Sequence, residues 1–384
     1  MADPHRAEIA AAGLIVVKVG TRVLTGPDGL LDEARIESLG RQFDAILAAG
    51  RRVVLVSSGA VGAGMGRMGI SKRPQELAHL QAVAAIGQSC LIEAYERVLR
   101  AHGRHAAQVL LVADDLKHRT RYLNIRNTLR ALLDYGAVPI INENDTVSVE
   151  ELRTSFGDND RLAALVATLL GAPLLVLLSD VQGLFDRHPS EPGASRLDIV
   201  PRIDETVAGL ARDRAGGLSK GGMASKIAAA AIVTEAGGSC VIASGRDDGV
   251  LERICRGESE GTLFPGREST MPAWKRWLGW SADPRGTVTV DAGAREAVLA
   301  RGRSLLAAGV TAIDGSFETG DVISLATADG RVFARGLVNY PVEELRRIAG
   351  LKTEQIAAVL GYCPYEEVVH RDNLAVIRRD TPTT

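Results

Sequence analysis

Two lysine-containing motifs have the residue types needed to bind a phosphate group. Lys18-Val19-Gly20-Thr21 ends an apolar run, and Lys220-Gly221-Gly222-Met223-Ala224-Ser225-Lys226 leads into a helical pattern. Glycine lets the backbone approach a ligand, and the start of a helix presents free N–H groups to an anion. A lysine ammonium is a compact charge that can follow a phosphoryl group during its transfer. The plainer alternative for Lys18 is that it caps the edge of a strand.

Lysine is scarce in this chain, which makes its positions informative. There are only 7 lysines against 38 arginines, and three of the seven lie in these two motifs. A genomic preference for arginine codons explains the ratio itself. It does not explain the positions, because arginine could have served at any site that only needs a positive charge.

Two short boxes concentrate acids and amides. Asn142-Glu143-Asn144-Asp145 follows a predicted strand, and Gly157-Asp158-Asn159-Asp160 comes twelve residues later. Carboxylates and amides suit a polar zwitterion or a metal ion. The alternative is turn and N-cap chemistry, in which Asp158 or Asn159 caps the following helix.

Short motifs of small or polar residues also follow two further predicted strands. Ser57-Ser58-Gly59-Ala60 opens a predicted helix, and Ser179-Asp180 ends another strand. Gly64 to Gly69 matches the GxGxxG pattern of dinucleotide-binding proteins, but it begins seven residues after its strand, so we interpret the match as accidental.

Together the motifs predict phosphoryl transfer from a nucleotide to a small acidic acceptor. A side-chain carboxylate, with a pKa of about 4.3, is already ionised and needs no general base. This agrees with the seven histidines, all of which lie outside the motifs.

The elements that position these motifs alternate between strands and helices. The strand candidates are almost wholly apolar, which is typical of a parallel sheet covered on both faces. Ligands in such sheets bind beyond the carboxyl ends of the strands, where the motifs lie. The first two-thirds therefore predicts a three-layer α/β domain. The expected strands are Gly13–Val19, Arg52–Ser57, Ala107–Val112, Val138–Asn142, Leu174–Ser179 and Ser239–Ala243, and the expected helices are Glu33–Ala49, Glu76–His102, Arg119–Tyr135, Asp160–Leu170, Ile203–Arg212 and Met223–Ala236.

The remainder of the chain has a different character. All three tryptophans fall in a proline-containing stretch, for which a docking segment, a simple linker and a nucleic-acid stacking platform remain open. Beyond it a small β-rich unit is expected, with a helix at Pro341–Ala349 and a last strand at Glu366–His370. The expected domains are 8–268, a linker at 269–284 and 285–373. The expected strands of the last unit are Thr287–Val290, Val310–Asp314, Asp321–Thr327 and Arg331–Leu337, with turns at Asp314-Gly315 and Asp329-Gly330.

Composition excludes several classes of protein. The formal net charge is −2, and residues 285–373 hold ten Lys and Arg against twelve Asp and Glu, which argues against nucleic-acid binding driven by bulk charge. A local basic patch remains open. The four cysteines are scattered, which argues against a zinc site or a disulfide framework and favours the cytoplasm. No apolar run reaches the length of a membrane span.

The ordered motifs resemble those of the amino-acid kinase family. The resemblance rests on Lys-x-Gly-Thr, Ser-Gly-Ala, Ile-Asn-Glu-Asn-Asp, Gly-Asp-Asn-Asp, Leu-Ser-Asp and Gly-Gly-Met-x-x-Lys, and it covers residues about 10 to 373. The β-rich unit looks like a PUA domain, so the fold implied is an open αβα sheet followed by a small PUA-like barrel. The two acidic boxes combined with a PUA-like domain are similar to the branch that phosphorylates the γ-carboxylate of L-glutamate with ATP, the first step of proline biosynthesis.

The resemblance implies roles for individual residues. Lys18, Lys226 and Asp160 would be catalytic, with Asp160 placing the two lysines. Magnesium would be carried by the ATP phosphates rather than by a protein site. Glutamate would be held by Ser58, Asp145 and Asn159 with Gly59 and Ala60, and ATP would contact Lys18, Gly20, Ser179, Asp180, Lys220, Gly221, Gly222, Met223, Ala224, Ser225 and Lys226.

Two positions depart from the family pattern, and regulation is also implied. Ser179 stands where threonine is commoner, and Lys220 stands where a small hydroxyl residue is usual, so both departures lie on the nucleotide side of the site. Feedback inhibition by proline near the loop between the acidic boxes, and assembly into a homodimer or homotetramer, are further expectations.

Two other functions are kept open. A kinase of the same fold could act on acetylglutamate, aspartate or a nucleoside monophosphate, and a panel of acceptors would separate these. An RNA-binding role for the PUA-like unit is disfavoured by its acidic count and would need salt-sensitive binding of structured RNA.

Overall fold

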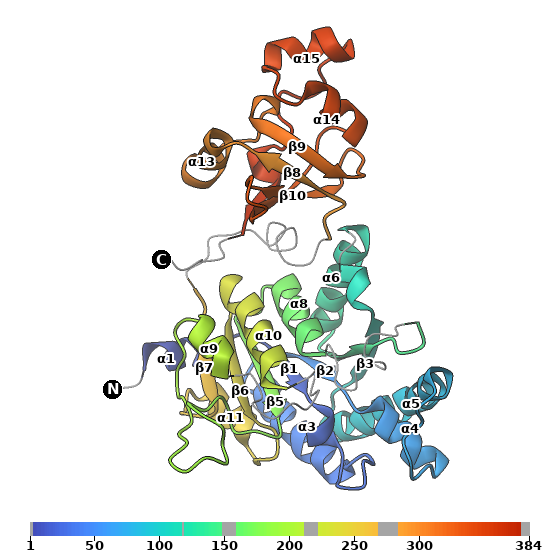
Figure 1. Cartoon of the computed structure of the whole chain (residues 1–384). Helices are drawn as coiled ribbons and strands as arrows, with labels where there is room; N and C mark the ends of the chain where they lie inside the picture. The colour runs from blue at the N-terminus through green and yellow to red at the C-terminus, as the bar shows by residue number, and fades with distance from the viewer. Residues whose placement is uncertain (1–2, 117–118, 148–158, 211–221, 268–282, 378–384) are drawn as a thin grey trace. The chain divides into compact units, whose positions relative to one another are not determined.

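A computed structural model of the chain describes residues 3–116, 119–147, 159–210, 222–267 and 283–377 (Figure 1). The chain divides into two compact units, the first formed by Met1–Leu116 and Thr120–Thr270 and the second by the residues from Met271 onward. The tryptophan-rich stretch at 269–284 lies almost wholly outside the described residues. The domain boundaries expected from the sequence stay a prediction.

The first unit is built on a seven-stranded sheet. Its strand order is β3-β4-β2-β1-β5-β6-β7, and every neighbouring pair is parallel except β6 and β7. All residues of β1, β4, β5 and β6 are buried, as their continuous apolar sequences predicted. The strands are β1 (Leu14–Val19), β2 (Arg52–Ser57), β3 (Ala106–Leu111), β4 (Val138–Glu143), β5 (Leu174–Ser179), β6 (Ser239–Ser244) and β7 (Thr262–Phe264).

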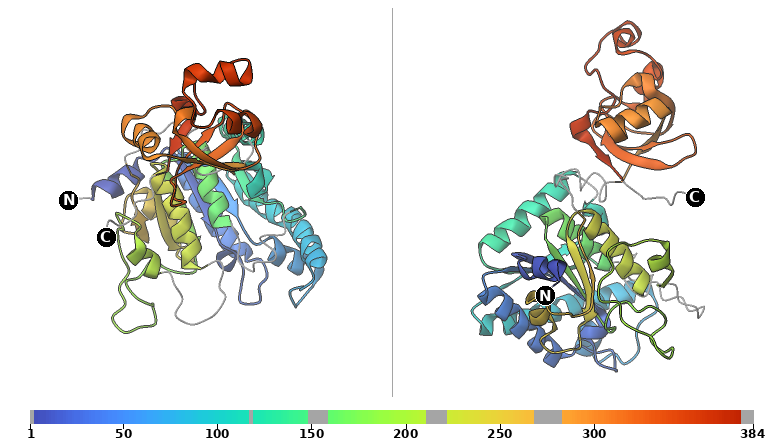
Figure 2. Two further views of the ribbon diagram at one scale, coloured as in Figure 1. Left: turned by 45° about the horizontal axis from the view of Figure 1, so that its top comes forward. Right: turned by 90° about the vertical axis from the view of Figure 1, so that its left-hand side faces the viewer.

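Helices cover both faces of this sheet, which confirms the three-layer architecture (Figures 1 and 2). Helices α8 and α10 contact each other on one face, while α3 contacts both α5 and α11 on the other. The helices among the described residues are α1 (Pro4–Ala10), α2 (Thr21–Leu24), α3 (Glu33–Ala48), α4 (Ala60–Met68), α5 (Leu77–Ala101), α6 (Arg119–Asp134), α8 (Asn159–Leu170), α9 (Glu205–Leu210), α10 (Met223–Glu235) and α11 (Val250–Cys255), and a 3-10 turn lies at Ala113–Leu116.

The first glycine of the GxGxxG match serves helix packing. A Cβ at Gly64 of α4 would lie 1.9 Å from the Val83 carbonyl oxygen of α5, and one at Gly87 of α5 would lie 1.7 Å from the Ala60 carbonyl oxygen of α4. Gly69 ends α4 in the left-handed conformation, with φ of 63°. These close approaches explain why α4 and α5 can pack together, and they support our interpretation of the motif as accidental.

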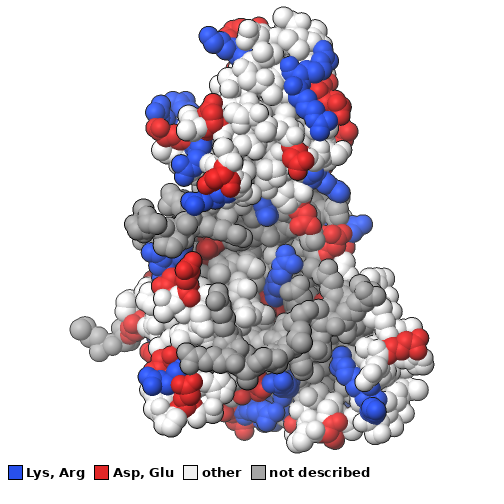
Figure 3. Space-filling view, viewed as in Figure 1, with Lys and Arg blue, Asp and Glu red and all other residues white. Residues whose placement is uncertain are grey.

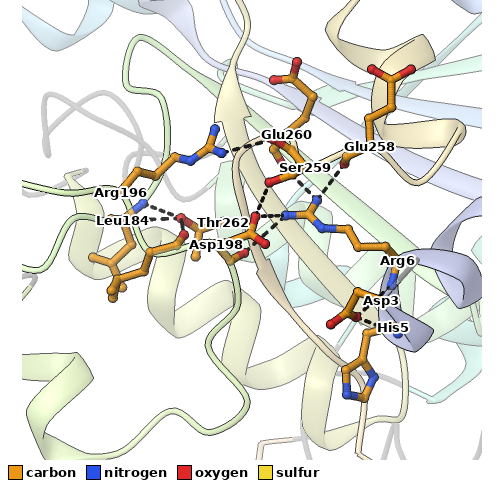
Figure 4. A network of polar contacts seen from close by, with 11 residues as sticks. Asp3, His5, Arg6, Leu184, Arg196, Asp198, Glu258, Ser259, Glu260 and Thr262 are labelled. Carbon is orange, nitrogen blue, oxygen red and sulfur yellow. Dashed lines mark hydrogen bonds and ion pairs between the residues drawn. The ribbon is translucent and has the colours of Figure 1, made fainter. Parts of the chain in front are cut away.

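A buried arginine attaches the N-terminal helix to the segment that precedes β7 and to Asp198 (Figure 4). Arg6 is 3% exposed and donates hydrogen bonds to the carbonyl oxygens of Glu258 and Glu260, at 3.1 and 2.9 Å. It also forms a 2.6 Å ion pair with Asp198. Thr262 of β7 accepts a hydrogen bond from Leu184 N at 2.8 Å, so the segment after β5 is held to the same edge.

The second unit contains a five-stranded mixed sheet of order β12-β11-β10-β8-β9. Only β8 and β10 pair in parallel. Its elements are β8 (Gly286–Val290), α13 (Ala292–Arg301), a 3-10 turn at Ala307–Gly309, β9 (Val310–Gly315), β10 (Val322–Ala326), β11 (Val332–Leu337), α14 (Val342–Ile348), α15 (Thr353–Leu360), a 3-10 turn at Arg371–Asn373 and β12 (Leu374–Val376).

Several sequence-based expectations for this unit are corrected. The last strand is β12 and not Glu366–His370, where only Val369 forms an isolated bridge, to Leu305. Asp314-Gly315 lies at the end of β9 rather than in a turn. The turn at Asp329-Gly330 is confirmed, since Gly330 has φ of 80° and its N–H bonds to Thr327.

No helix among the described residues is long and apolar enough to cross a membrane.

Candidate functional site

The carboxyl ends of the central strands bring the sequence motifs together. Lys18 of β1 is in register with Val56 of β2 on one side and Leu177 of β5 on the other. Ser179, the last residue of β5, pairs with Ser244, the last residue of β6. Motifs more than 100 residues apart in the sequence therefore end at the same edge of the sheet, which is where open α/β sheets bind ligands.

A buried carboxylate at this edge holds both motif lysines. Lys18 Nζ lies 2.7 Å from Asp160 Oδ1, and Lys226 Nζ lies 3.1 Å from Asp160 Oδ2. Ser225 Oγ donates a 2.7 Å hydrogen bond to the second oxygen. Asp160 is 1% exposed and each lysine 7%. Three elements thus meet at one carboxylate: Lys18 comes from β1, Asp160 from α8 and the Ser225-Lys226 pair from α10.

The charged side chains of this group shift the pKa values of Asp160 and Lys226. Burial alone would raise the pKa of Asp160, but the ammonium groups of Lys18 and Lys226 outweigh it and lower the pKa to about 2. Burial lowers the pKa of Lys226 below its usual range, with Asp160 acting in the opposite direction. Two ammonium groups on one carboxylate leave the group with net positive charge, which suits an anionic ligand.

A second group of buried polar residues surrounds the side-chain amide of Asn159. Asn159 Nδ2 donates to Ser58 Oγ at 3.0 Å and to Asn142 Oδ1 at 3.3 Å. The same amide lies 3.4 Å from the carbonyl oxygen of Ser57. All four residues are buried. The ends of β2 and β4 are therefore linked through the side chain of Asn159, the first residue of α8.

Two acids are gathered at the end of β4. Asp145 and Glu143 are 5% and 4% exposed, and Gln88 of α5 lies 3.5 Å from Asp145 Oδ2 and 3.4 Å from the Glu143 carbonyl oxygen. Burial, and secondarily the charge of Glu143, raise the pKa of Asp145 to about 6, while Gln88 and Arg73 act against this rise. This part of the edge is electronegative, which suits a cationic group such as an ammonium.

The end of β5 is more open. Ser179 Oγ donates to Asp180 Oδ1 at 3.1 Å, and Arg22 donates to Asp180 Oδ2 at 3.0 Å. Burial would raise the pKa of Asp180, but the hydrogen bond from Arg22 leaves it lowered. Gly222, in extended conformation, precedes the first turn of α10, formed by Met223, Ala224 and Ser225. Lys220 and Gly221 lie outside the described residues, as do Gly157 and Asp158 of the second acidic box.

Two glycines bring the backbone close to these groups. A Cβ at Gly20 would lie 3.4 Å from the Leu178 oxygen and 3.6 Å from Lys18 Nζ, which are ordinary van der Waals separations, so the backbone here lies next to the ammonium. Gly59 has φ of 99°, a conformation that L-residues rarely adopt, and it precedes Ala60, the first residue of α4. The backbone N–H groups at this helix start are those that an anion can use.

Sequence reasoning missed three residues that contact residues of the motifs: Arg22, Gln88 and Tyr95. Gln88 and Tyr95 lie inside the long helix α5, 57 and 38 residues from the motif residues they contact, so spacing gave no signal for them. Arg22 lies next to the Lys18 motif, and its proximity could have suggested a role. Among the described residues, no group of three or more His, Cys, Asp or Glu side chains could hold a metal ion.

Comparison with known proteins adds three findings. The model of the amino acid kinase family matches residues 13–244, and that of the PUA domain matches residues 286–360. A protein of Rhodopirellula baltica named glutamate 5-kinase is 47% identical over 362 residues, covering 94% of this chain and 93% of that protein. One of the same name from Syntrophotalea carbinolica is 48% identical over 363 residues, covering 94% of this chain and 96% of that protein.

Proposed function

Because the chain belongs to the amino acid kinase family, we propose that it transfers the terminal phosphoryl group of ATP to the γ-carboxylate of L-glutamate. The product would be L-glutamyl 5-phosphate, the first intermediate of proline biosynthesis. The observation that carries this proposal is the pair of lysines on Asp160, because it offers two buried ammonium groups to a transferring phosphoryl group. The names of relatives at 47 and 48% identity supply the acceptor.

The electronegative group would bind the amino acid. The Asp145 carboxylate is suited to the ammonium of glutamate, and Ser58 and Asn159 to its polar oxygens, with Gly59 and Ala60 beside them. The nucleotide would lie along the ends of β5 and α10, against Ser179 and Asp180 and the segment Gly20, Lys220, Gly221, Gly222, Met223, Ala224, Ser225.

The chemical step requires no protein base. An oxygen of the ionised γ-carboxylate attacks the γ-phosphorus, a new P–O bond forms, and the bond from that phosphorus to the β,γ-bridging oxygen breaks as ADP leaves. Lys18 and Lys226 would neutralise the charge on the phosphoryl oxygens, while Asp160 holds both ammonium groups in place.

A magnesium ion would bind here to the phosphate groups of ATP and not to a site made of protein side chains. Asp160, the most buried carboxylate at the lysine pair, already accepts from Ser225 and contacts two ammonium groups, so its oxygens are committed to the chain's own residues. Bound Mg²⁺ would supply charge neutralisation on the ATP phosphates.

Three further proposals concern regulation, assembly and cellular location. We propose feedback inhibition by proline, a homo-oligomeric assembly and a cytoplasmic location, which are the expectations of the sequence. RNA binding is not favoured for the second unit. On the face shown in Figure 3, basic and acidic side chains of this unit are interspersed and form no separate basic surface.

The test is an acceptor panel with Mg-ATP and purified full-length chain. ADP release should depend on L-glutamate and should be weak with acetylglutamate, aspartate and nucleoside monophosphates. A preference for any of these other acceptors would overturn the assignment of substrate, and absence of ADP release with all of them would overturn the kinase assignment.

A further inference from the structure

We propose that Tyr95 is a positioning residue that sets, through Ser57, the orientation of the Ser58–Gly59 peptide at the phosphoryl-transfer site. This inference rests on the proposed function, in which Gly59 lies beside the bound glutamate, whose carboxylate receives the phosphoryl group. Tyr95 itself touches neither substrate. It lies on α5, among the core residues that pack under the sheet, and it is 0% exposed.

The contacts form a short chain from the core to the site. The Tyr95 hydroxyl oxygen lies 3.2 Å from Ser57 Oγ, and Ser57 Oγ donates to the Ser58 carbonyl oxygen at 3.1 Å. Ser57 is 0% exposed, and it is the last residue of β2. Both hydroxyl groups are therefore removed from water, so their hydrogen bonds are made within the protein.

The direction of these bonds follows from counting hydrogens. A serine hydroxyl has a single hydrogen, and Ser57 donates it to the Ser58 carbonyl oxygen. The Tyr95 hydroxyl must therefore be the donor to Ser57 Oγ. Burial raises the pKa of Tyr95 above its usual range, so the phenol keeps its proton at neutral pH. The donation to Ser57 in turn polarises the serine hydroxyl and strengthens its bond to the carbonyl.

Fixing this carbonyl also fixes an N–H group. The peptide unit is planar, and no described peptide bond is cis, so the Gly59 N–H points opposite to the Ser58 carbonyl. Gly59 has φ of 99°, where a glycine backbone has a wide choice of conformations and needs an external restraint. Among the described contacts, the Ser57 hydroxyl is the group that holds this carbonyl.

Ser58 itself is held by two further bonds. The Ser58 N–H, which belongs to the preceding peptide, donates to the Val19 carbonyl oxygen at 3.2 Å, and Ser58 Oγ accepts from Asn159 Nδ2 at 3.0 Å. Val19 directly follows Lys18, so the Ser57–Ser58 peptide is attached to the strand that carries the catalytic lysine. An N–H donor aimed at developing charge is effective when its orientation is set before the reaction.

Tyr95→Phe tests this chain with little disturbance, because phenylalanine preserves the packing of the ring. Losing the restraint should lower kcat by about tenfold, which is less than the effect of removing such a donor outright. The KM values for glutamate and ATP should stay within about twofold, because the loss falls on the transition state. Ser57→Ala should have a larger effect of the same kind.

A double variant tests whether Tyr95 acts through Ser57. If it does, Tyr95→Phe in the Ser57→Ala background should change kcat by less than about twofold. Effects that multiply would show that the two residues act separately and would overturn the proposed chain. Should Tyr95→Phe fail to fold, the kinetics of Ser57→Ala still decide, since unchanged kcat in that variant removes the link to the peptide.

Two further measurements separate positioning from a general loss of stability. Thr168→Val is the matched control, because Thr168 also has a buried hydroxyl, which donates to the Ala164 carbonyl oxygen at 2.8 Å within α8. It should lower the melting temperature as Tyr95→Phe does and leave kcat unchanged. Calorimetric affinity for Mg-ADP, aluminium fluoride and glutamate together, a mimic of the group in flight, should fall in Tyr95→Phe by the same factor as kcat.

The outcomes distinguish this inference from the proposed function. Wild-type chain without glutamate-dependent turnover would overturn both. An active wild type together with a Tyr95→Phe variant whose kcat and affinity for the mimic are unchanged would overturn the role of Tyr95 alone.

Discussion

Two buried aspartates at the same edge of the sheet have opposite electrostatic surroundings. Asp160 contacts two lysine ammonium groups, and its pKa is lowered to about 2. Asp145 is buried beside Glu143, and its pKa is raised to about 6. Two buried carboxyl groups therefore have opposite pKa shifts, because their neighbouring charges differ.

Asp160 already contacts groups of opposite charge, so we call Asp160, Lys18 and Lys226 the completed group. Asp145 lies beside another acid, so we call Asp145 and Glu143 the incomplete group. The ammonium groups around Asp160 balance its charge and leave a positive excess for an incoming phosphoryl group. Asp145 and Glu143 are two acids whose mutual repulsion a bound ammonium would relieve. On the proposed function, one region of the site is preorganised for the phosphoryl group, while the other is stabilised by its substrate.

Lys18→Arg should have the largest effect, because it alters the completed group. A planar guanidinium cannot occupy the place of a compact ammonium 2.7 Å from Asp160, so kcat should fall by about 100-fold or more while the fold is preserved. Steady-state kinetics and circular dichroism would measure this. The matched control is Lys352→Arg at an exposed position of the second unit, which should keep the wild-type rate. Near-normal turnover of Lys18→Arg would remove Lys18 from the catalytic role.

Replacing each aspartate by asparagine should change stability in opposite directions. The folded pKa of Asp160 lies below its unfolded value of 3.8, so its contribution is present above that pH and is lost as pH falls toward 2. Asp160→Asn should therefore lower the free energy of unfolding at neutral pH by about 2 kcal/mol. The folded pKa of Asp145 lies above 3.8, so its charged form opposes folding at neutral pH.

Asp145→Asn should accordingly raise the free energy of unfolding by roughly 2 kcal/mol at neutral pH, and this gain should shrink as pH falls from 6 toward 4. The same variant should bind glutamate poorly. Urea unfolding of both variants across this range would measure the effect. Equal destabilisation by the two substitutions would contradict the contrast between the two regions.

Asn159→Ala tests the amide beside the incomplete group. Removing the donor to Ser58 and Asn142 should raise the KM for glutamate by about tenfold and leave the KM for ATP within about twofold. Initial rates with each substrate varied in turn would measure both constants. An equal rise in the two KM values would mean that Asn159 supports the whole site and does not distinguish its regions.

Removing the residues after about 268 should have the smallest effect on the chemistry. Every residue discussed for the site lies in the first unit, so a folded truncation should retain glutamate-dependent activity, within about tenfold of the full chain. Complete loss of activity in a folded truncation would show that the second unit is needed for catalysis. The full-length chain assayed at the same concentration is the control.

The sequence predicted the parallel sheet well because its strands are buried on both faces and therefore continuously apolar. The family resemblance implied that Lys18, Asp160 and Lys226 share one site, and the structure brings the three side chains together. It could not find Tyr95 or Gln88, since a helix residue that supports a distant motif has the same pattern as a core residue.

The second unit shows the same limit in its secondary structure. Helix α13 was missed although Asp291 caps its start and Gly302 ends it in the left-handed conformation. The last strand was misplaced because Glu366–His370 contains the apolar pair Val368-Val369. That pair packs in the core without extended pairing, whereas the three residues of β12 are too short to show a period.

The most direct test of the account is to trap the product with hydroxylamine, which converts an acyl phosphate into a hydroxamate. With Mg-ATP and L-glutamate, the purified chain should form hydroxamate in step with ADP release, and added proline should reduce both. Glutamate-dependent ADP release without hydroxamate would contradict phosphorylation of a carboxylate, and hydroxamate formed from another acid in preference to glutamate would contradict the assigned substrate.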